Sequence, residues 1–103
     1  MSRPLDHRRL AAENRHFAGT CGVSAEAARM RLLPAFRDPR SGRVEIARFR
    51  NGAPAPVHLI EGLPEEWALA HDERGAVKVL RADIVCGFVC GEQFYTRAEA
   101  AAL

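Results

Sequence analysis

The sequence predicts an α+β fold: an antiparallel sheet of consecutive hairpins with an N-terminal helical segment and a short capped C-terminal helix. Three observations predict it. Good helix formers precede residue 34, short apolar runs separated by turn residues follow it, and a Thr-x-x-Glu capping pattern stands at residues 96–99. A chain of 103 residues suffices for one core. We therefore expect an N-terminal arm or short helix at residues 1–20 and a single α+β domain at residues 21–103.

Helices are predicted on both sides of the sheet. Ser24 is an N-cap residue type, and residues 25–32 are mostly good helix formers that end before Pro34. The Thr96 hydroxyl and the Glu99 carboxylate can each accept the other residue's backbone N–H, so a short helix is expected after Thr96. The apolar stripe within the first twenty residues is thin, which leaves a short helix and an arm as alternatives.

The first hairpin is predicted from turn chemistry. Residues 35–37 and 43–49 flank a turn in which Pro39 fixes φ and Gly42 permits a positive φ. Residues 57–60 are then expected to form an edge strand, because the prolines just before them cannot donate ladder hydrogen bonds.

Two further strand regions follow along the chain. Residues 63–71 fit either the start of a helix or a strand, and the turn after them favours a hairpin of 66–71 with 76–81. Residues 84–90 are apolar on both faces, which is typical of a central strand covered on two sides. The expected core consists of apolar side chains from the second helix and the strands: Leu32, Phe36, Val44, Ile46, Phe49, Leu59, Trp67, Leu69, Val77, Val79, Ile84, Phe88 and Phe94.

Composition indicates a cytoplasmic protein. No stretch approaches the roughly 20 apolar residues that span a bilayer, so no membrane association is expected. The first nineteen residues carry charges and lack the apolar segment of a secretion signal. Cys21, Cys86 and Cys90 make an odd number of cysteines, which fits free thiols better than a disulfide framework.

Charge divides the chain into a basic and an acidic half. Residues 1–50 hold eleven arginines against five acidic residues, whereas residues 51–103 hold four basic and eight acidic residues. Within one predicted helix and one hairpin, seven arginines form a candidate site for an anion or an acidic partner. These are Arg29, Arg31, Arg37, Arg40, Arg43, Arg48 and Arg50. The alternative is a solvated face that the acidic half partly neutralises, and we favour it for most of them.

No chemistry-bearing motif is recognisable. Cys86 and Cys90 would share one side of a strand about 13 Å apart, too far for one zinc ion, and only a helical segment would bring them within reach. No nucleophile elbow, phosphate-binding loop or GxGxxG pattern occurs. We therefore expect no metal, no cofactor and no enzymatic activity. Tyr95 is the aromatic residue best suited to an exposed position, because its hydroxyl favours water.

Three stretches of the chain resemble a group of small proteobacterial proteins without an assigned activity, some of them in mobile-element contexts. The stretches are Gly22-Val23-Ser24, residues 34–67 (PAFRDPRSGRVEIARFRNGAPAPVHLIEGLPEEW) and residues 84–101 (IVCGFVCGEQFYTRAEAA). This resemblance implies an accessory protein, such as a host-defence inhibitor or a transfer-related regulator. It implies no catalytic residues.

The functional expectation is therefore a binding module. A protein partner bound through an exposed sheet face or an unpaired strand edge is the leading hypothesis, and a homodimer is one form of it. Direct nucleic-acid binding through the arginine-rich region 29–50 is the alternative, and an unrecognised small enzyme is the third.

Overall fold

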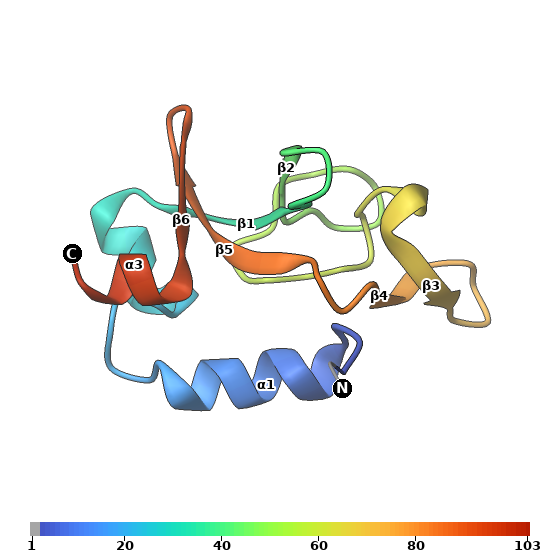
Figure 1. Ribbon diagram of the computed structural model, residues 1–103, viewed down its shortest axis with the longest axis horizontal. Helices are drawn as coiled ribbons and strands as arrows, with labels where there is room; N and C mark the ends of the chain where they lie inside the picture. The colour runs from blue at the N-terminus through green and yellow to red at the C-terminus, as the bar shows by residue number, and fades with distance from the viewer. Residues whose placement is uncertain (1–2) are drawn as a thin grey trace.

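The computed structural model describes residues 3–103; the first two residues of the predicted arm lie outside this range. Within it, six strands form two antiparallel sheets (Figure 1). The four-stranded sheet has the order β2-β1-β5-β6, and the two-stranded sheet pairs β3 with β4. Together with three α-helices, these sheets confirm the predicted α+β class. The strands are β1 (Leu33–Arg37), β2 (Val44–Ile46), β3 (Ala68–His71), β4 (Val77–Leu80), β5 (Val85–Cys90) and β6 (Gln93–Thr96).

Consecutive strands pair as hairpins, as predicted, and a long-range pairing joins the first hairpin to the third. β1 pairs with β2 and also with β5, where Phe36 lies opposite Cys86. β5 therefore lies in the middle of the sheet, and β6 forms one edge. The turn after β1 adopts the predicted geometry, with Gly42 at a φ of 78°.

Two strand predictions are corrected. β2 ends at Ile46 rather than at residue 49, because the chain then folds back on itself: Ala55 donates its backbone N–H to the carbonyl of Ala47 at 2.9 Å. Residues 57–60 form no strand. Instead, this segment lies against the inner side of the sheet, where the imidazole of His58 bonds a carbonyl of β5.

The ambiguous segment 63–71 contains both predicted alternatives in succession. A 3₁₀ turn, η2 (Glu65–Trp67), leads directly into β3. β3 pairs with β4 in the expected hairpin, with register irregularities on both sides of Ala70. Leu5 extends this small sheet through an isolated bridge to Leu80.

The helices differ from the prediction mainly in their bounds. α1 (His7–His16) is capped by Asp6, whose side chain accepts the N–H of Arg9. α2 (Ser24–Ala27) begins at Ser24 itself, so Ser24 is not the N-cap, and a 3₁₀ turn, η1 (Ala28–Met30), continues it.

The expected helix at 25–32 stops early because the chain turns left-handed. Arg31 has a φ of 58°, and Leu32 donates its N–H to the carbonyl of Ala27, as in a Schellman motif. At the other end of the chain, α3 (Arg97–Ala101) carries the predicted capping box between Thr96 and Glu99.

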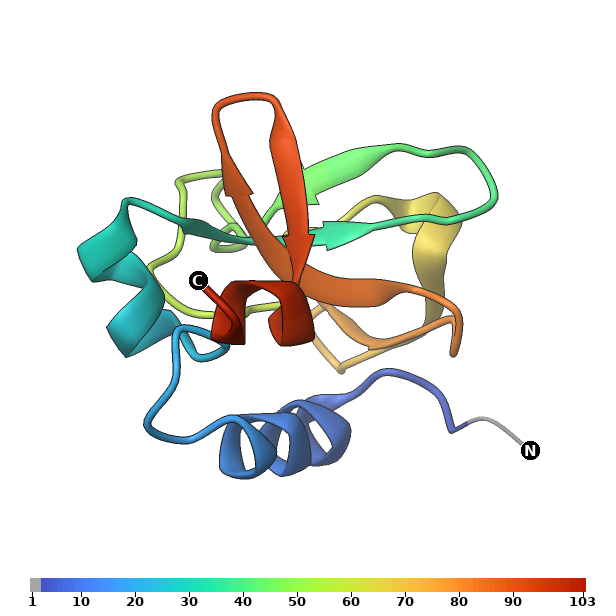
Figure 2. The ribbon, with the colours of Figure 1, turned by 60° about the vertical axis from the view of Figure 1, so that its left-hand side comes forward.

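The core lies on the inner face of the four-stranded sheet, the face toward the helices (Figures 1 and 2). Six predicted core residues are buried: Leu32, Phe36, Trp67, Val77, Ile84 and Phe88. Five more are half-buried: Val44, Ile46, Leu59, Val79 and Phe94. The prediction is wrong for Phe49, which is 41% exposed, and for Leu69, which is 59% exposed. Buried residues outside the predicted set include Leu5, Leu10, Ile60, Leu63 and Leu80.

None of the helices described within residues 3–103 is long and apolar enough to cross a membrane.

Candidate functional site

The four-stranded sheet has an outer face that no helix within residues 3–103 covers. Strand register places ten residues on this face, because directly opposed residues of neighbouring strands share a side. The outer face consists of Leu33, Ala35, Arg37, Val44, Ile46, Val85, Gly87, Val89, Phe94 and Thr96. The buried helix residues Leu10, Ala27 and Ala100 all pack into clusters with inner-face side chains. The sheet is therefore covered by helices on one side only.

Apolar side chains dominate the outer face. Leu33 is 51% exposed, and its register neighbours Val89 and Phe94 are half-buried. A Cβ atom at Gly87 would lie 2.6 Å from Cζ of Phe94, so the phenyl ring lies directly over this glycine. The predicted central strand β5 is thus buried on its inner side and only half covered on its outer side. This corrects the expectation of a strand covered on both faces.

Arg37 is the one charged residue of the outer face. It is exposed and makes no ion pair within the part of the chain that the structure describes. No carboxylate shares the outer face with it. An apolar surface with a single guanidinium is suited to a partner that has both apolar side chains and a carboxylate.

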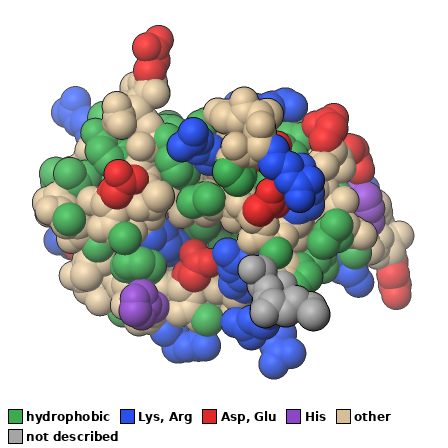
Figure 3. All heavy atoms as spheres, in the orientation of Figure 1, with side chains coloured by type: hydrophobic (Ala, Val, Ile, Leu, Met, Phe, Trp, Pro, Cys, Tyr) green, Lys and Arg blue, Asp and Glu red, His purple; other side chains and the backbone are tan. Residues whose placement is uncertain are grey.

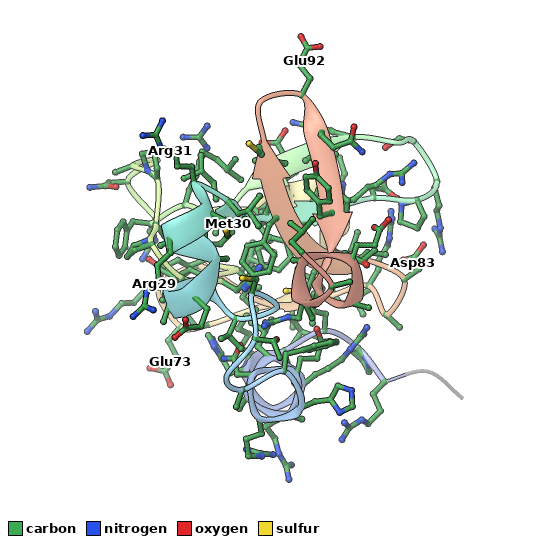
Figure 4. The ribbon with its side chains drawn as sticks, turned by 90° about the vertical axis from the view of Figure 1, so that its left-hand side faces the viewer. Arg29, Met30, Arg31, Glu73, Asp83 and Glu92 are labelled. Carbon is green, nitrogen blue, oxygen red and sulfur yellow. The ribbon has the colours of Figure 1, made fainter. Side chains whose placement is uncertain are left out.

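The sheet also has an open edge at β6. No strand of the described chain pairs with its far side. The hairpin of β5 and β6 projects from the body of the molecule, and Glu92 stands at its tip (Figure 4). Backbone donors and acceptors on such an edge can accept a strand from another chain.

The seven arginines of the predicted site fall into separate groups. Arg29 and Arg31 flank Met30 at the start of β1, with Arg29 paired to Glu26 at 3.5 Å. Arg37 lies at the opposite end of β1, and the turn that follows carries Arg40 and Arg43.

Most of these arginines are already engaged. Arg40 pairs with Asp83 at 2.9 Å, and Arg43 pairs with both Glu45 and Glu66. Arg48 and Arg50 donate to backbone carbonyls of nearby turns. Arg31 and Arg37 have neither an ion pair nor a side-chain hydrogen bond among the described residues.

The turn that carries Arg40 is held by Asp38, which is buried. Burial opposes ionisation of this carboxyl, but hydrogen bonds from the Arg40 N–H, the Ser41 hydroxyl and the Arg81 guanidinium outweigh it and lower its pKa. Arg81 reaches Asp38 at 2.5 Å from the loop before β5. Asp38 thus fixes the geometry of the turn, and Arg40 is positioned as part of it.

The remaining candidate residues are dispersed. Tyr95 is half-buried and packs on the cluster around Phe88, so it is less exposed than its hydroxyl suggests. Cys21, Cys86 and Cys90 are free thiols, and no group of three or more potential metal ligands occurs in the described part of the chain. Cys86 and Cys90 lie on a strand, β5, as predicted for residues 84–90.

A buried polar cluster ties the helices to the inner face of the sheet. Nε2 of His58 donates to the carbonyl of Gly87 at 2.6 Å, and Nη2 of Arg97 donates to Nδ1 of the same ring at 3.2 Å. Arg97 also donates from Nη1 to the carbonyl of Gly22, while its Nε lies 3.1 Å from Oε1 of Glu13 without hydrogen-bond alignment. The sequence carried no signal for this cluster, because its members lie far apart along the chain.

Burial shifts the pKa values of two side chains in and beside this cluster away from neutral pH. Burial lowers the pKa of His58 to about 3, and the neighbouring Arg97 charge adds to the effect. The imidazole is therefore neutral at physiological pH. Burial likewise raises the pKa of the Cys86 thiol to about 12, which leaves it protonated. Neither side chain is suited to proton transfer or nucleophilic attack near neutral pH.

No protein-family model matches the chain, and no match was found among curated proteins or solved structures.

Proposed function

We propose that this chain is a non-enzymatic protein-binding module that docks a partner protein on the outer face of its four-stranded sheet. The observation that supports the proposal is the apolar outer face, on which Leu33 is half exposed and over which no helix lies. Leu33, Val89 and Phe94 are neighbours in register, and adjoining apolar side chains on a surface mark candidate protein-interaction sites. The accessory role implied by the sequence resemblance is compatible with such a binding module.

Arg37 favours a different protein over a second copy of the chain. Two copies meeting through their outer faces would bring two Arg37 side chains into the contact and no carboxylate, because the outer face contains none. Desolvating an arginine without a carboxylate partner is unfavourable. The partner is therefore expected to present apolar side chains around an aspartate or glutamate.

The alternative of nucleic-acid binding through region 29–50 is less favoured, because three of its seven arginines are ion-paired and two bond carbonyls.

A matched pair of variants tests the protein-binding proposal. Leu33→Asp places a charge on the outer face, whereas Leu69→Asp places the same charge at a similarly exposed leucine of the two-stranded sheet. Wild-type chain and both variants are used to capture proteins from the native host, and each captured protein is then purified and titrated. We expect at least one protein to bind the wild type and the Leu69→Asp variant and to bind Leu33→Asp at least tenfold more weakly.

Two outcomes contradict the proposal. One is a set of captured proteins that both variants bind equally well or equally poorly. The other is a dimer of the purified chain, detected by sedimentation, that Leu33→Asp dissociates and Leu69→Asp does not, because the outer face would then be occupied by a second copy.

A further inference from the structure

A second surface, on α1, has a different chemistry from the outer face. Five of the ten residues of α1 are basic: His7, Arg8, Arg9, Arg15 and His16. Arg8, Ala11, Ala12 and Arg15 are spaced by three, four and seven residues, so they lie on one side of the helix. In Figure 3, basic side chains gather along the lower rim of the molecule, where Figure 1 places α1.

This side of α1 is hollowed against the N-terminal segment. One depression of about 360 Å³ and an adjoining one of about 410 Å³ share Arg3 and Ala12 as lining residues. We call the two together the α1 groove. It is lined by Arg3, Arg8, Arg9, Ala11, Ala12, Glu13, Arg15, His16 and Ala82. Its charged lining residues are thus four arginines and one glutamate.

Three of these arginines are without partners. Arg3, Arg8 and Arg15 make no ion pair and no side-chain hydrogen bond within the described residues. The glutamate is already bound by two guanidinium groups, since Glu13 lies 3.3 Å from Nε of Arg9 and 3.1 Å from Nε of Arg97. The α1 groove therefore has a net positive charge, although Asp6, which caps α1, lines an adjoining depression with Arg3 and Arg8.

We propose that the α1 groove binds the phosphate backbone of a nucleic-acid duplex. Guanidinium groups bind phosphates through paired, charge-assisted hydrogen bonds. Arg8 and Arg15 are two helical turns apart, and the roughly 10 Å between them equals the axial rise of about three base pairs of a duplex. They can thus contact different phosphates, with Arg3 beside them.

The lining of the groove favours nucleic acid over an acidic protein. Apart from its charged and histidine side chains it consists of alanines, and none of the exposed large apolar residues of the molecule lies on α1. A protein partner of useful affinity generally needs buried apolar or aromatic anchors, which this surface does not offer. The groove is lined by no phenylalanine, tyrosine or tryptophan, and its one aromatic ring, His16, packs edge-on against Phe17. This lining favours a duplex over single strands, which bind by stacking. Binding is accordingly expected to be independent of base sequence.

The α1 groove and the outer face are independent surfaces. α1 packs on the inner side of the sheet through Leu10, in the same cluster as Phe36. A protein partner on the outer face leaves the groove accessible.

Fluorescence anisotropy with a labelled DNA duplex of arbitrary sequence tests the proposal. With three phosphate contacts, the slope of log affinity against log salt is about −2.7, so affinity falls roughly 40-fold between about 50 and 200 mM salt. The double variant Arg8→Gln/Arg15→Gln is expected to reduce this slope to about −0.9. Both side chains are exposed, and circular dichroism verifies that the variant folds.

The matched control is Arg74→Gln/Lys78→Gln, which removes two exposed cations of the β3–β4 hairpin that have no ion pair among the described residues and produces the same change in net charge. It should leave the slope near −2.7. Equal weakening by both double variants would mean a response to net charge alone and would overturn the proposal. A larger effect of the control, absence of binding at low salt, or equally tight binding of polyglutamate would overturn it too.

Discussion

Nη2 of Arg97 lies 3.2 Å from Nδ1 of His58, and both side chains are more than nine-tenths buried. A carbonyl can only accept, so the bond from His58 to Gly87 places the ring proton on Nε2 and leaves Nδ1 as the acceptor for Arg97. This arrangement requires a neutral imidazole. It joins α3, the loop before residue 60 and β5 in one buried contact.

Stability should therefore depend on pH through His58. Its pKa is lowered from 6.5 in the unfolded chain to about 3 in the folded protein. The unfolded state binds the extra proton first, so the contribution to stability is complete above pH 6.5 and is lost as pH falls toward 3. Urea denaturation should show wild-type stability falling more steeply than that of His58→Gln, by up to about 1.4 kcal/mol per pH unit.

Replacing Arg97 should destabilise the fold strongly. Arg97→Met leaves Nδ1 of His58 and the carbonyl of Gly22 without their donor, and each unsatisfied buried group costs about 1–3 kcal/mol. We expect a loss of about 3 kcal/mol in the free energy of unfolding, against less than about 0.5 kcal/mol for Arg8→Met at the surface. The pKa of His58, followed by NMR, should rise in the same variant because a neighbouring positive charge is gone. An unchanged pKa would argue against the direct contact.

Gly87 should not tolerate a side chain. A Cβ atom there would lie 2.1 Å from the carbonyl oxygen of Tyr95 and 2.6 Å from the Phe94 ring. Gly87→Ala must therefore separate β5 from β6, and thermal denaturation should show a loss of more than about 2 kcal/mol. Gly42→Ala is the comparison: it has open space and only the strain of a positive φ, so its cost should be about 1 kcal/mol. Equal costs would contradict the close approach.

The two cysteines of β5 should differ in reactivity. Burial raises the pKa of the Cys86 thiol to about 12, despite the nearby Arg97 charge, whereas the Cys90 side chain is exposed. In a Cys21→Ser background, a thiol reagent should modify Cys90 in the native protein. Modification of Cys86 should follow the rate of unfolding. Rapid labelling of both thiols in native buffer would contradict this burial.

Local signals in the sequence predicted many of the elements. The capping box at Thr96 and Glu99, the turn ending at Gly42 and the hairpin of residues 68–80 all depend on neighbours in the chain, and the structure confirms them. The predicted helix ends were less accurate. The left-handed turn at Arg31 is stabilised by backbone hydrogen bonds, which cannot be predicted from the residue types there. The prediction of the core was wrong for Leu69. The alternation of apolar residues placed it on the buried side of its strand, but it faces solvent.

For the candidate surfaces too, the sequence predicted which residue types are present but not which contacts they make. Sequence alone indicated an arginine-rich first half, but it could not show which arginines have carboxylate partners, since Arg40 and Asp83 are distant in the chain. The sequence did not predict the α1 groove, because the apolar stripe of the first twenty residues is thin and left open whether they form a helix. Only Leu10 of α1 is buried.

By itself, then, the sequence determined the α+β class, the order of hairpins and the capped last helix, because those features follow from residues within a few positions of one another. The tertiary structure alone decided that β1 pairs with β5, that one sheet face remains open, and that Arg97 meets His58. Contacts between residues separated by tens of positions depend on how the elements pack together, and packing is a property of the assembled chain.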